Sequence, residues 1–375
     1  MKAVLTLLFA IVAALGLRAQ DAAHWNAEAA RSYLDGRMAW WINWPVAARD
    51  HQTFCISCHT ALPFALARPA LRGALGEQTP SANEIRIIEN VTKRVRLWNE
   101  VEPFYPDAQR GVPKTAESRG TESILNALIL VWSQARSNDA RLALTNMWAQ
   151  QLTNGDAAGA WNWLQFHNSP WEGDSQYYGA TLAALAAGIA GDLPPGARLL
   201  RDYLVRNQES QILFSRVMLL WASTKWPGAA LLSATQQKAI IDAALAKQQA
   251  DGGFTLSSFV GNWKRHDNTP LETKSDGLAT GLVALVLQEA GVPASQSQAK
   301  RALAWLNQNQ DKTEGRWYAY SLNKQRDLSS DAGRFMSDAA TAFAVLALEE
   351  SDSKARISQN RKAMPDEHSN LHPGR

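Results

Sequence analysis

The chain of 375 residues contains only two cysteines and seven histidines. Two cysteines form at most one disulfide, so the sequence excludes a disulfide-rich scaffold and a four-cysteine zinc site. The formal net charge is only +3 and falls toward zero if the N-terminus is removed, which argues against a nucleic-acid-binding protein. Beyond the first twenty residues no apolar run is long enough to span a bilayer, so we expect no stable membrane span in the mature chain.

Both cysteines fall in one pentad, Cys55-Ile56-Ser57-Cys58-His59. Cys-x-x-Cys-His is the attachment signature of c-type haem. In such a site the two thiols add to the haem vinyl groups, and the adjacent imidazole becomes the proximal iron ligand. The pentad therefore predicts one covalent haem c, with Cys55 and Cys58 as thioether links and His59 as the iron ligand.

Two other interpretations of the cysteines remain open at this point. Cys55 and Cys58 could form a redox-active disulfide, although nothing nearby has the βαβ pattern of a thioredoxin-like protein. They could also supply half of a zinc site, but such a site needs a second pair of ligands at short spacing. The only such pair, His368 and His372, lies in a polar C-terminal tail that is poorly suited to fix a metal.

The N-terminus has the pattern of a secretory signal peptide. Lys2 precedes an apolar run over residues 3–17, and Ala19 provides a small residue at a plausible cleavage point. We therefore predict a signal peptide over 1–19, with an uncleaved membrane anchor as the alternative. Because bacteria attach haem c outside the cytoplasmic membrane, export and the pentad support the same expectation: a periplasmic or secreted protein.

The rest of the chain repeats itself with a period of about 50–60 residues. Each copy has a helix that ends in a Gly-aromatic turn, a polar loop, and a second helix rich in Ala, Thr and Leu. The clearest copies are 159–163 with 174–185, 249–254 with 274–285, and 314–318 with 336–346. Weaker copies occur near 97–128 and 204–220, and the pentad opens a sixth.

This alternation predicts an all-α fold. The second helix of each pair is apolar on nearly all faces and should be buried, whereas the first is amphipathic and should be outside. We therefore expect an α/α toroid of about six helical hairpins in a closed ring, spanning 20–350, with the haem-attachment segment at 51–68. Residues 351–375 are charged and lack apolar periodicity, which predicts a disordered tail.

The repeats resemble the terpene cyclase and prenyltransferase toroid family. The segment 302–317 carries the strongest match, because Gln310 at a helix end is followed by Gly315-Arg316-Trp317, as in the family's Gln-Trp motif. A weaker copy covers 243–254. The resemblance implies the scaffold, covers residues 145–350 well, and covers the N-terminal third poorly.

The catalytic residues of that family are missing. Its squalene–hopene-type cyclases use an Asp-x-Asp-Asp run as the protonating acid, whereas the corresponding helix starts here offer single acids, Asp276 and Asp338. Its protein prenyltransferases bind zinc through Asp, Cys and His, and the pentad already uses both cysteines. A fold does not carry a function, so the resemblance supports the scaffold and not the chemistry.

In such a ring all inner helices run the same way, so the haem should lie at the mouth where their N-termini meet. Ring closure then places Met336 near the iron, and we predict it as the distal ligand, because Met opposite His is typical of electron-transfer cytochromes. Met38, His51, His167, His266 and an open iron position are the alternatives. Arg119 and Arg334, also expected at the mouth, are candidates to pair with the haem propionates.

Four carboxylates recur at similar places in the repeats: Asp251, Asp267, Asp276 and Asp338. Paired acids would suit glycoside hydrolysis, which other α/α toroids perform. Their repeated position instead favours turn and cap roles, with Asp276 and Asp338 as helix N-caps.

These patterns together predict an exported monohaem c-type cytochrome that transfers electrons to a partner protein or senses redox state. One alternative is a haem-dependent oxidoreductase that acts on an apolar or isoprenoid-like molecule in the toroid cavity. A second alternative is a binding module in which the haem is structural.

Overall fold

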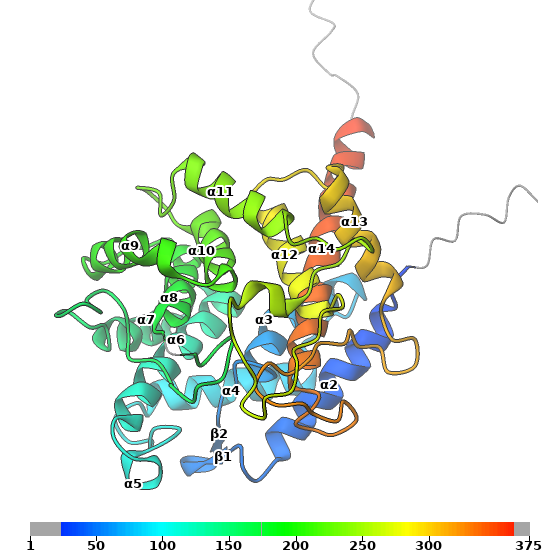
Figure 1. Ribbon diagram of the computed structural model, residues 1–375. Coiled ribbons are helices and arrows are strands. Elements are labelled where there is room, and N and C mark those ends of the chain that lie inside the picture. Colours follow the sequence, from blue (N-terminus) through cyan, green and yellow to red (C-terminus); the bar gives the residue numbers. More distant parts are fainter. Residues whose placement is uncertain (1–23, 174, 364–375) are drawn as a thin grey trace, which may run out of the picture.

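The computed structural model describes residues 24–173 and 175–363. The predicted signal peptide, residues 1–19, lies outside them. The described residues form thirteen α-helices and one two-stranded antiparallel sheet (Figure 1). None of these helices is long and apolar enough to cross a membrane.

The helices of the first half are α2 (Ala27–Asn43), α3 (Ala61–Ala74), α4 (Ala82–Arg96), α5 (Asp107–Arg110), α6 (Lys114–Gln134), α7 (Asn138–Ala149) and α8 (Tyr177–Ala190). Those of the second half are α9 (Gly196–Asn207), α10 (Leu213–Lys225), α11 (Ala234–Leu245), α12 (Gly277–Glu289), α13 (Ser297–Gln308) and α14 (Phe335–Ala363). The strands are β1 (Ala48–Arg49) and β2 (Thr53–Phe54), and short 3₁₀ turns occupy Asp50–Gln52, Gln208–Ser210 and Leu256–Phe259.

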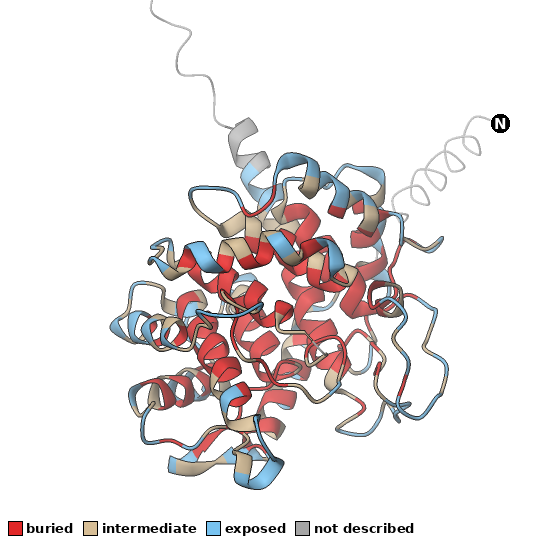
Figure 2. Ribbon diagram, turned by 60° about the vertical axis from the view of Figure 1, so that its left-hand side comes forward, coloured by how far each residue is buried: buried red, intermediate tan, exposed pale blue. Residues whose placement is uncertain are grey.

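Buried and half-exposed helices alternate along the chain, and the all-α prediction is confirmed. In α12 every residue from Gly277 to Gln288 is buried, whereas α11 buries only Ile240, Ala244 and Leu245. Figure 2 shows the buried helices at the centre with exposed helices around them. The inner helices α3, α6, α8, α10, α12 and α14 contact one another in this order, and α14 contacts α3. This cyclic order agrees with the predicted ring of hairpins.

Three glutamines that follow outer helices make the same pair of hydrogen bonds. Each donates from Nε2 to the carbonyl of the glycine in the turn after it, and to a carbonyl at the start of the next outer helix. The sets are Gln151 with Gly159 and Gly196, Gln248 with Gly252 and Gln298, and Gln310 with Gly315 and Asn26. The last set joins the sixth hairpin to the first, because Asn26 is the N-cap of α2.

Gly315 shows why this junction requires glycine. Its φ is +77°, and an added Cβ would lie 2.2 Å from the carbonyl oxygen of Ala29 in α2. Only a residue without a side chain allows the turn after α13 to pack so closely on the first hairpin.

Aromatic side chains fill the space between the inner helices. Trp221 of α10 contacts Trp132 of α6 and Phe343 of α14, with ring centroids 6.0 Å apart in both pairs. Trp221 is fully buried. The space between the inner helices is therefore filled with side chains where Trp132, Trp221 and Phe343 meet.

Two sequence predictions about helix ends need correction, and a third is confirmed. Helix α6 begins at Lys114, so Arg119, which we expected at the mouth formed by the helix N-termini, lies within the helix. Asp276 caps α12 as predicted, by accepting from the backbone N–H groups of the first turn. Helix α14 already begins at Phe335, so Asp338 is not an N-cap and its carboxylate is used elsewhere.

Helix α14 continues to Ala363, past residue 351, where we expected the tail to begin. Lys354 explains part of this extension. Its ammonium group lies 2.9 Å from the Glu350 carboxylate one turn earlier and donates to the carbonyl of Gln288 in α12. Charged residues that looked like a solvated tail thus support a helix. Residues 364–375 lie outside the described residues.

Candidate functional site

A short β-hairpin holds the first cysteine of the pentad. The N–H of Cys55 donates to Ala47 O at 2.8 Å, and the indole N–H of Trp41 donates to Cys55 O at 2.7 Å. The side-chain amide of Asn90, on α4, exchanges two hydrogen bonds with the backbone of Phe54. The segment before the pentad is therefore fixed to both α2 and α4.

The pentad then leads directly into α3. The hydroxyl of Ser57 accepts hydrogen bonds from the N–H groups of Thr60 and Ala61, at 3.2 and 3.0 Å. These are two of the N–H groups that have no partner within a helix at its N-terminus. Ser57, one of the two variable positions of Cys-x-x-Cys, thus acts as a cap for the helix that carries the site.

Both thiols are free and buried, with only 5% of Cys55 and 6% of Cys58 exposed. Burial raises the pKa of Cys55 to about 12 and the pKa of Cys58 well above its usual value. The nearby carboxylate of Glu172 acts in the same direction on both thiols. At neutral pH the folded chain therefore holds both cysteines as protonated thiols.

Aromatic rings surround His59. Phe335 stacks on its face at 3.9 Å between ring centroids, Trp41 meets it edge-on at 5.1 Å, and Trp171 lies at 6.2 Å. These rings come from the start of α14, from α2 and from the loop before α8. Burial lowers the pKa of His59 to about 3, with the charge of Arg37 as a further cause, so the imidazole is neutral at physiological pH.

One ring nitrogen of His59 already has a partner. Its Nδ1 lies 2.8 Å from Oγ1 of Thr60, and that hydroxyl donates to Oδ2 of Asp338 at 2.6 Å. The other carboxylate oxygen of Asp338 accepts from Tyr33 at 2.7 Å and from Arg37 Nε at 2.8 Å. Burial raises the pKa of Asp338, and the charge of Arg37 opposes this effect.

The residues present fit a covalently attached c-type haem. Two free thiols and one neutral imidazole lie within five consecutive residues, and no disulfide uses the sulfur atoms. Because Thr60 holds Nδ1, Nε2 is the ring nitrogen that would bind an iron. Phe335 covers the face of the imidazole. A metal–ligand bond forms at the edge of the ring, in its plane, so the stacked ring does not block it.

Met336 and Met38 both belong to the hydrophobic core. Met336 lies in the first turn of α14, directly after the ring that stacks on His59, and only 4% of it is exposed. Met38 lies on α2 and is fully buried. Met336 as distal ligand stays a prediction.

The three histidine alternatives lie in different surroundings. His51 is exposed, and its Nδ1 lies 2.9 Å from the Asp50 carboxylate. His167 and His266 pack together with ring centroids 5.2 Å apart, and Nε2 of His266 lies 2.8 Å from the carbonyl oxygen of His167. The loops before α8 and α12 therefore meet, as expected for segments that share one mouth.

The two predicted propionate partners are already engaged. Arg119 donates to the carbonyls of Trp98 and Val101 and lies over the Trp98 ring. Arg334 lies 3.5 Å from the Glu314 carboxylate. The cations that bear most directly on His59 are instead Arg37 and Arg326, which the sequence analysis did not select.

Three of the four recurring carboxylates have turn or cap roles. Asp251 accepts from Gly253 N and from the indole of Trp305, and Asp267 accepts from Thr269 N. Asp276 is the N-cap of α12. The turn and cap interpretation is thus confirmed for these three, and Asp338 alone belongs to the site.

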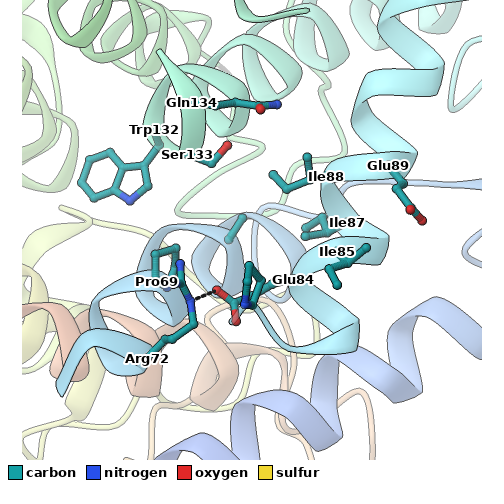
Figure 3. Close-up of a pocket in the computed structure, with 12 residues that line it drawn as sticks. Pro69, Arg72, Glu84, Ile85, Ile87, Ile88, Glu89, Trp132, Ser133 and Gln134 are labelled. Carbon is teal, nitrogen blue, oxygen red and sulfur yellow. Dashed lines mark hydrogen bonds and ion pairs between the residues drawn. The ribbon is translucent and has the colours of Figure 1, made fainter. Parts of the chain in front are cut away.

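The structure has an apolar pocket of about 350 Å³ between α3, α4 and α6 (Figure 3). Pro69 and Arg72 lie on its α3 side, and Ile87 and Ile88 lie on its α4 side. On α3 the lining begins at Ala65, four positions after the first residue of the helix, or about 6 Å along its axis. This pocket therefore lies between α3, α4 and α6, about one turn beyond the pentad, and not among the inner helices alone, where we expected a cavity.

Within residues 24–173 and 175–363, no group of three or more His, Cys, Asp or Glu side chains is arranged to hold a metal ion. Among these residues Cys55 and Cys58 therefore have no partners with which to complete a zinc site. Comparisons of the sequence with models of known protein families and with curated proteins give no match.

Proposed function

We propose that this chain is an exported monohaem c-type cytochrome on an α/α toroid, and that it transfers electrons or senses redox state. The observation that carries the proposal is the combination at the pentad. Cys55 and Cys58 are free thiols three positions apart, and the neighbouring His59 is neutral with its Nδ1 engaged by Thr60. This is the donor set that haem c attachment requires.

The iron of a bound haem c supplies one-electron exchange, and the chain's own residues set the conditions for it. Trp41, Phe335 and Trp171 pack around His59 and leave it only partly exposed to water. Less solvent around the ligand lowers the reorganisation that accompanies electron transfer. Met336 is the proposed distal ligand, which would raise the reduction potential.

The place of the site in the ring also supports the proposal. The loop before α8 and the first turn of α14 both contact His59, although they are far from it in sequence. These contacts are the ones expected of a pentad at one end of the predicted ring, and in this proposal a redox partner protein docks there. Export through a signal peptide over 1–19 belongs to the same proposal, because haem c is attached outside the bacterial cytoplasm.

A second candidate function rests on the pocket between α3, α4 and α6. Its apolar lining suits a small apolar or isoprenoid-like molecule. In this alternative Cys55, Cys58 and His59 would hold a haem that supplies oxidation chemistry with one iron position open, and an acceptor outside the chain would take the electrons. A structural haem in a pure binding module is the third possibility, and coordination and redox activity separate the three.

The first experiment is expression with its leader in a bacterial strain that matures c-type haem, followed by a reduced-state absorption spectrum. We expect a covalent haem with six-coordinate low-spin bands, which support electron transfer. A five-coordinate high-spin spectrum would favour the oxidoreductase. A haem that cannot be reduced and reoxidised would leave only the structural role.

Variants then test the individual residues. Cys55→Ala with Cys58→Ala should abolish covalent attachment, and His59→Ala should remove the proximal ligand. In Met336→Ala, loss of the low-spin bands supports ligation, whereas an unchanged spectrum rules Met336 out. Met218→Ala is a matched control, because Met218 is equally buried but lies on α10, outside the contacts of the site.

A further inference from the structure

A chain of hydrogen bonds connects His59 to the junction between the last and first hairpins. Thr60 Oγ1 lies between Nδ1 of His59, at 2.8 Å, and Oδ2 of Asp338, at 2.6 Å. Asp338 belongs to α14, the inner helix of the sixth hairpin, and His59 and Thr60 directly precede α3 of the first. The carboxylate and the imidazole are 279 positions apart in the sequence but are linked through one hydroxyl.

The direction of these hydrogen bonds follows from the chemistry of the groups. A threonine hydroxyl has one proton, and the carboxylate of Asp338, which is ion-paired with Arg37, can only accept. The hydroxyl therefore gives its proton to Asp338 and accepts from His59. This arrangement requires the proton of the neutral imidazole to reside on Nδ1, which leaves the lone pair on Nε2.

Other groups around the carboxylate keep it in place. Tyr33 and Arg37, both on α2, donate to its Oδ1, and Arg37 also binds the carboxylate of Asp331 at 2.8 Å. Asp338 itself is only 1% exposed. Because helix α2 supplies these donors, the carboxylate is fixed relative to the first hairpin even though α14 carries it.

We propose that Thr60 and Asp338 are positioning residues that fix the Nδ1–H tautomer of His59 and increase its electron donation to the haem iron. The inference about the iron rests on the proposed function, whereas the inference about the tautomer does not. A hydrogen bond from an iron-ligating imidazole toward a carboxylate makes the ligand more basic. A more basic ligand stabilises the ferric state and lowers the reduction potential.

The first test concerns the chain without haem. Nitrogen-15 NMR of the imidazole side chains should show His59 with its proton on Nδ1. Thr60→Val keeps the side-chain shape but removes the hydroxyl, and should lose this tautomer preference. Thr60→Ser retains the hydroxyl and should preserve it. A proton on Nε2 in the unsubstituted chain would overturn the proposal.

The second test concerns the haem-loaded chain. Thr60→Val should shift the midpoint reduction potential to more positive values, and Thr60→Ser should restore it toward the original value. Asp338→Asn should shift it in the same direction, and the double variant with Thr60→Val should add little. Equal potentials in all variants, or equal shifts in Thr60→Val and Thr60→Ser, would contradict the claim that the Thr60 hydroxyl lowers the reduction potential of the iron.

The two tests separate this inference from the proposed function. If the chain carries no covalent haem but His59 still has the Nδ1–H tautomer, the proposed function fails and the positioning role of Thr60 and Asp338 is supported. If haem is present and the tautomer or the potential does not depend on Thr60, the proposed function is supported and the positioning role fails.

Discussion

Removal of the Arg94 side chain should destabilise the protein strongly, because it leaves a buried charge without its partner. Arg94 Nε lies 2.5 Å from Oε1 of Glu122, and neither side chain is exposed. The same guanidinium donates to Thr53 in β2, at 2.6 Å, and to the carbonyl of Glu102. It therefore connects α4, α6 and the hairpin that presents the pentad.

The expected cost follows from this burial. Breaking a buried ion pair by removing one partner typically costs about 3–5 kcal/mol. Arg96 provides a control two positions later on the outer face of the same helix, because it pairs with Asp139 but is 63% exposed. An exposed pair contributes at most about 1 kcal/mol, so Arg96→Ala should be close to neutral.

Urea denaturation of Arg94→Ala and Arg96→Ala, followed by far-ultraviolet circular dichroism, measures the difference directly. We expect Arg94→Ala to lose at least about 3 kcal/mol of unfolding free energy relative to Arg96→Ala. Because Arg94 also holds β2, its variant should yield less covalent haem per folded chain. Equal stabilities of the two variants would refute the reasoning about the buried pair.

Three further predictions follow from burial and close packing. Burial raises the pKa of Glu172 from 4.5 to about 7, so the folded chain holds this proton more tightly than the unfolded chain. The unfolding free energy should therefore fall by about 3 kcal/mol as the pH rises from 4.5 to about 7. In Glu172→Gln, which cannot lose this proton, thermal melts should not show that fall. In Gly315→Ala the added methyl group would collide with the first turn of α2, so this variant should lose about 1–3 kcal/mol more unfolding free energy than Gly291→Ala. Gly291 is a matched control, because its φ is similar but its surroundings are open. Equal melting temperatures of the two variants would contradict this. In the folded chain without haem, Cys55 and Cys58 should resist alkylation at neutral pH, and mass spectrometry should show rapid modification of both only after denaturation.

Features that depend on local patterns could be predicted from the sequence. The alternation of apolar and amphipathic segments predicted the inner and outer helices. A helix buried on all faces is apolar throughout, whereas a helix buried on one face is apolar on that face only. Gln310 and the glycine after it were identified as a helix-end motif, and the hydrogen bond between Gln310 and Gly315 is present. Asp276 was identified as a cap for the same reason.

Features that depend on distant contacts could not be predicted. Asp338 looked like a cap, because nothing near it in the sequence shows that Arg37 and Tyr33 donate to its carboxylate. The hydrogen bond between Thr60 and Asp338 joins residues 278 positions apart. The repeats predict that the ring ends meet, but they do not say which side chains meet there.

The helical end of α14 shows a different limit. Residues 351–363 carry many charges and no apolar period, which is also the composition of a disordered segment. The contacts of Lys354 with Glu350 and with the carbonyl of Gln288 are specific to this packing. Composition alone does not distinguish a solvated helix from a disordered tail.

The central claim is that a porphyrin is linked through thioether bonds to Cys55 and Cys58. Intact mass spectrometry of the denatured protein, purified from a strain that matures c-type haem, tests it most directly. We predict a mass equal to the mature chain plus one haem, with loss of that increment in Cys55→Ala with Cys58→Ala. A denatured chain that has only the mass of its amino acids would contradict the account.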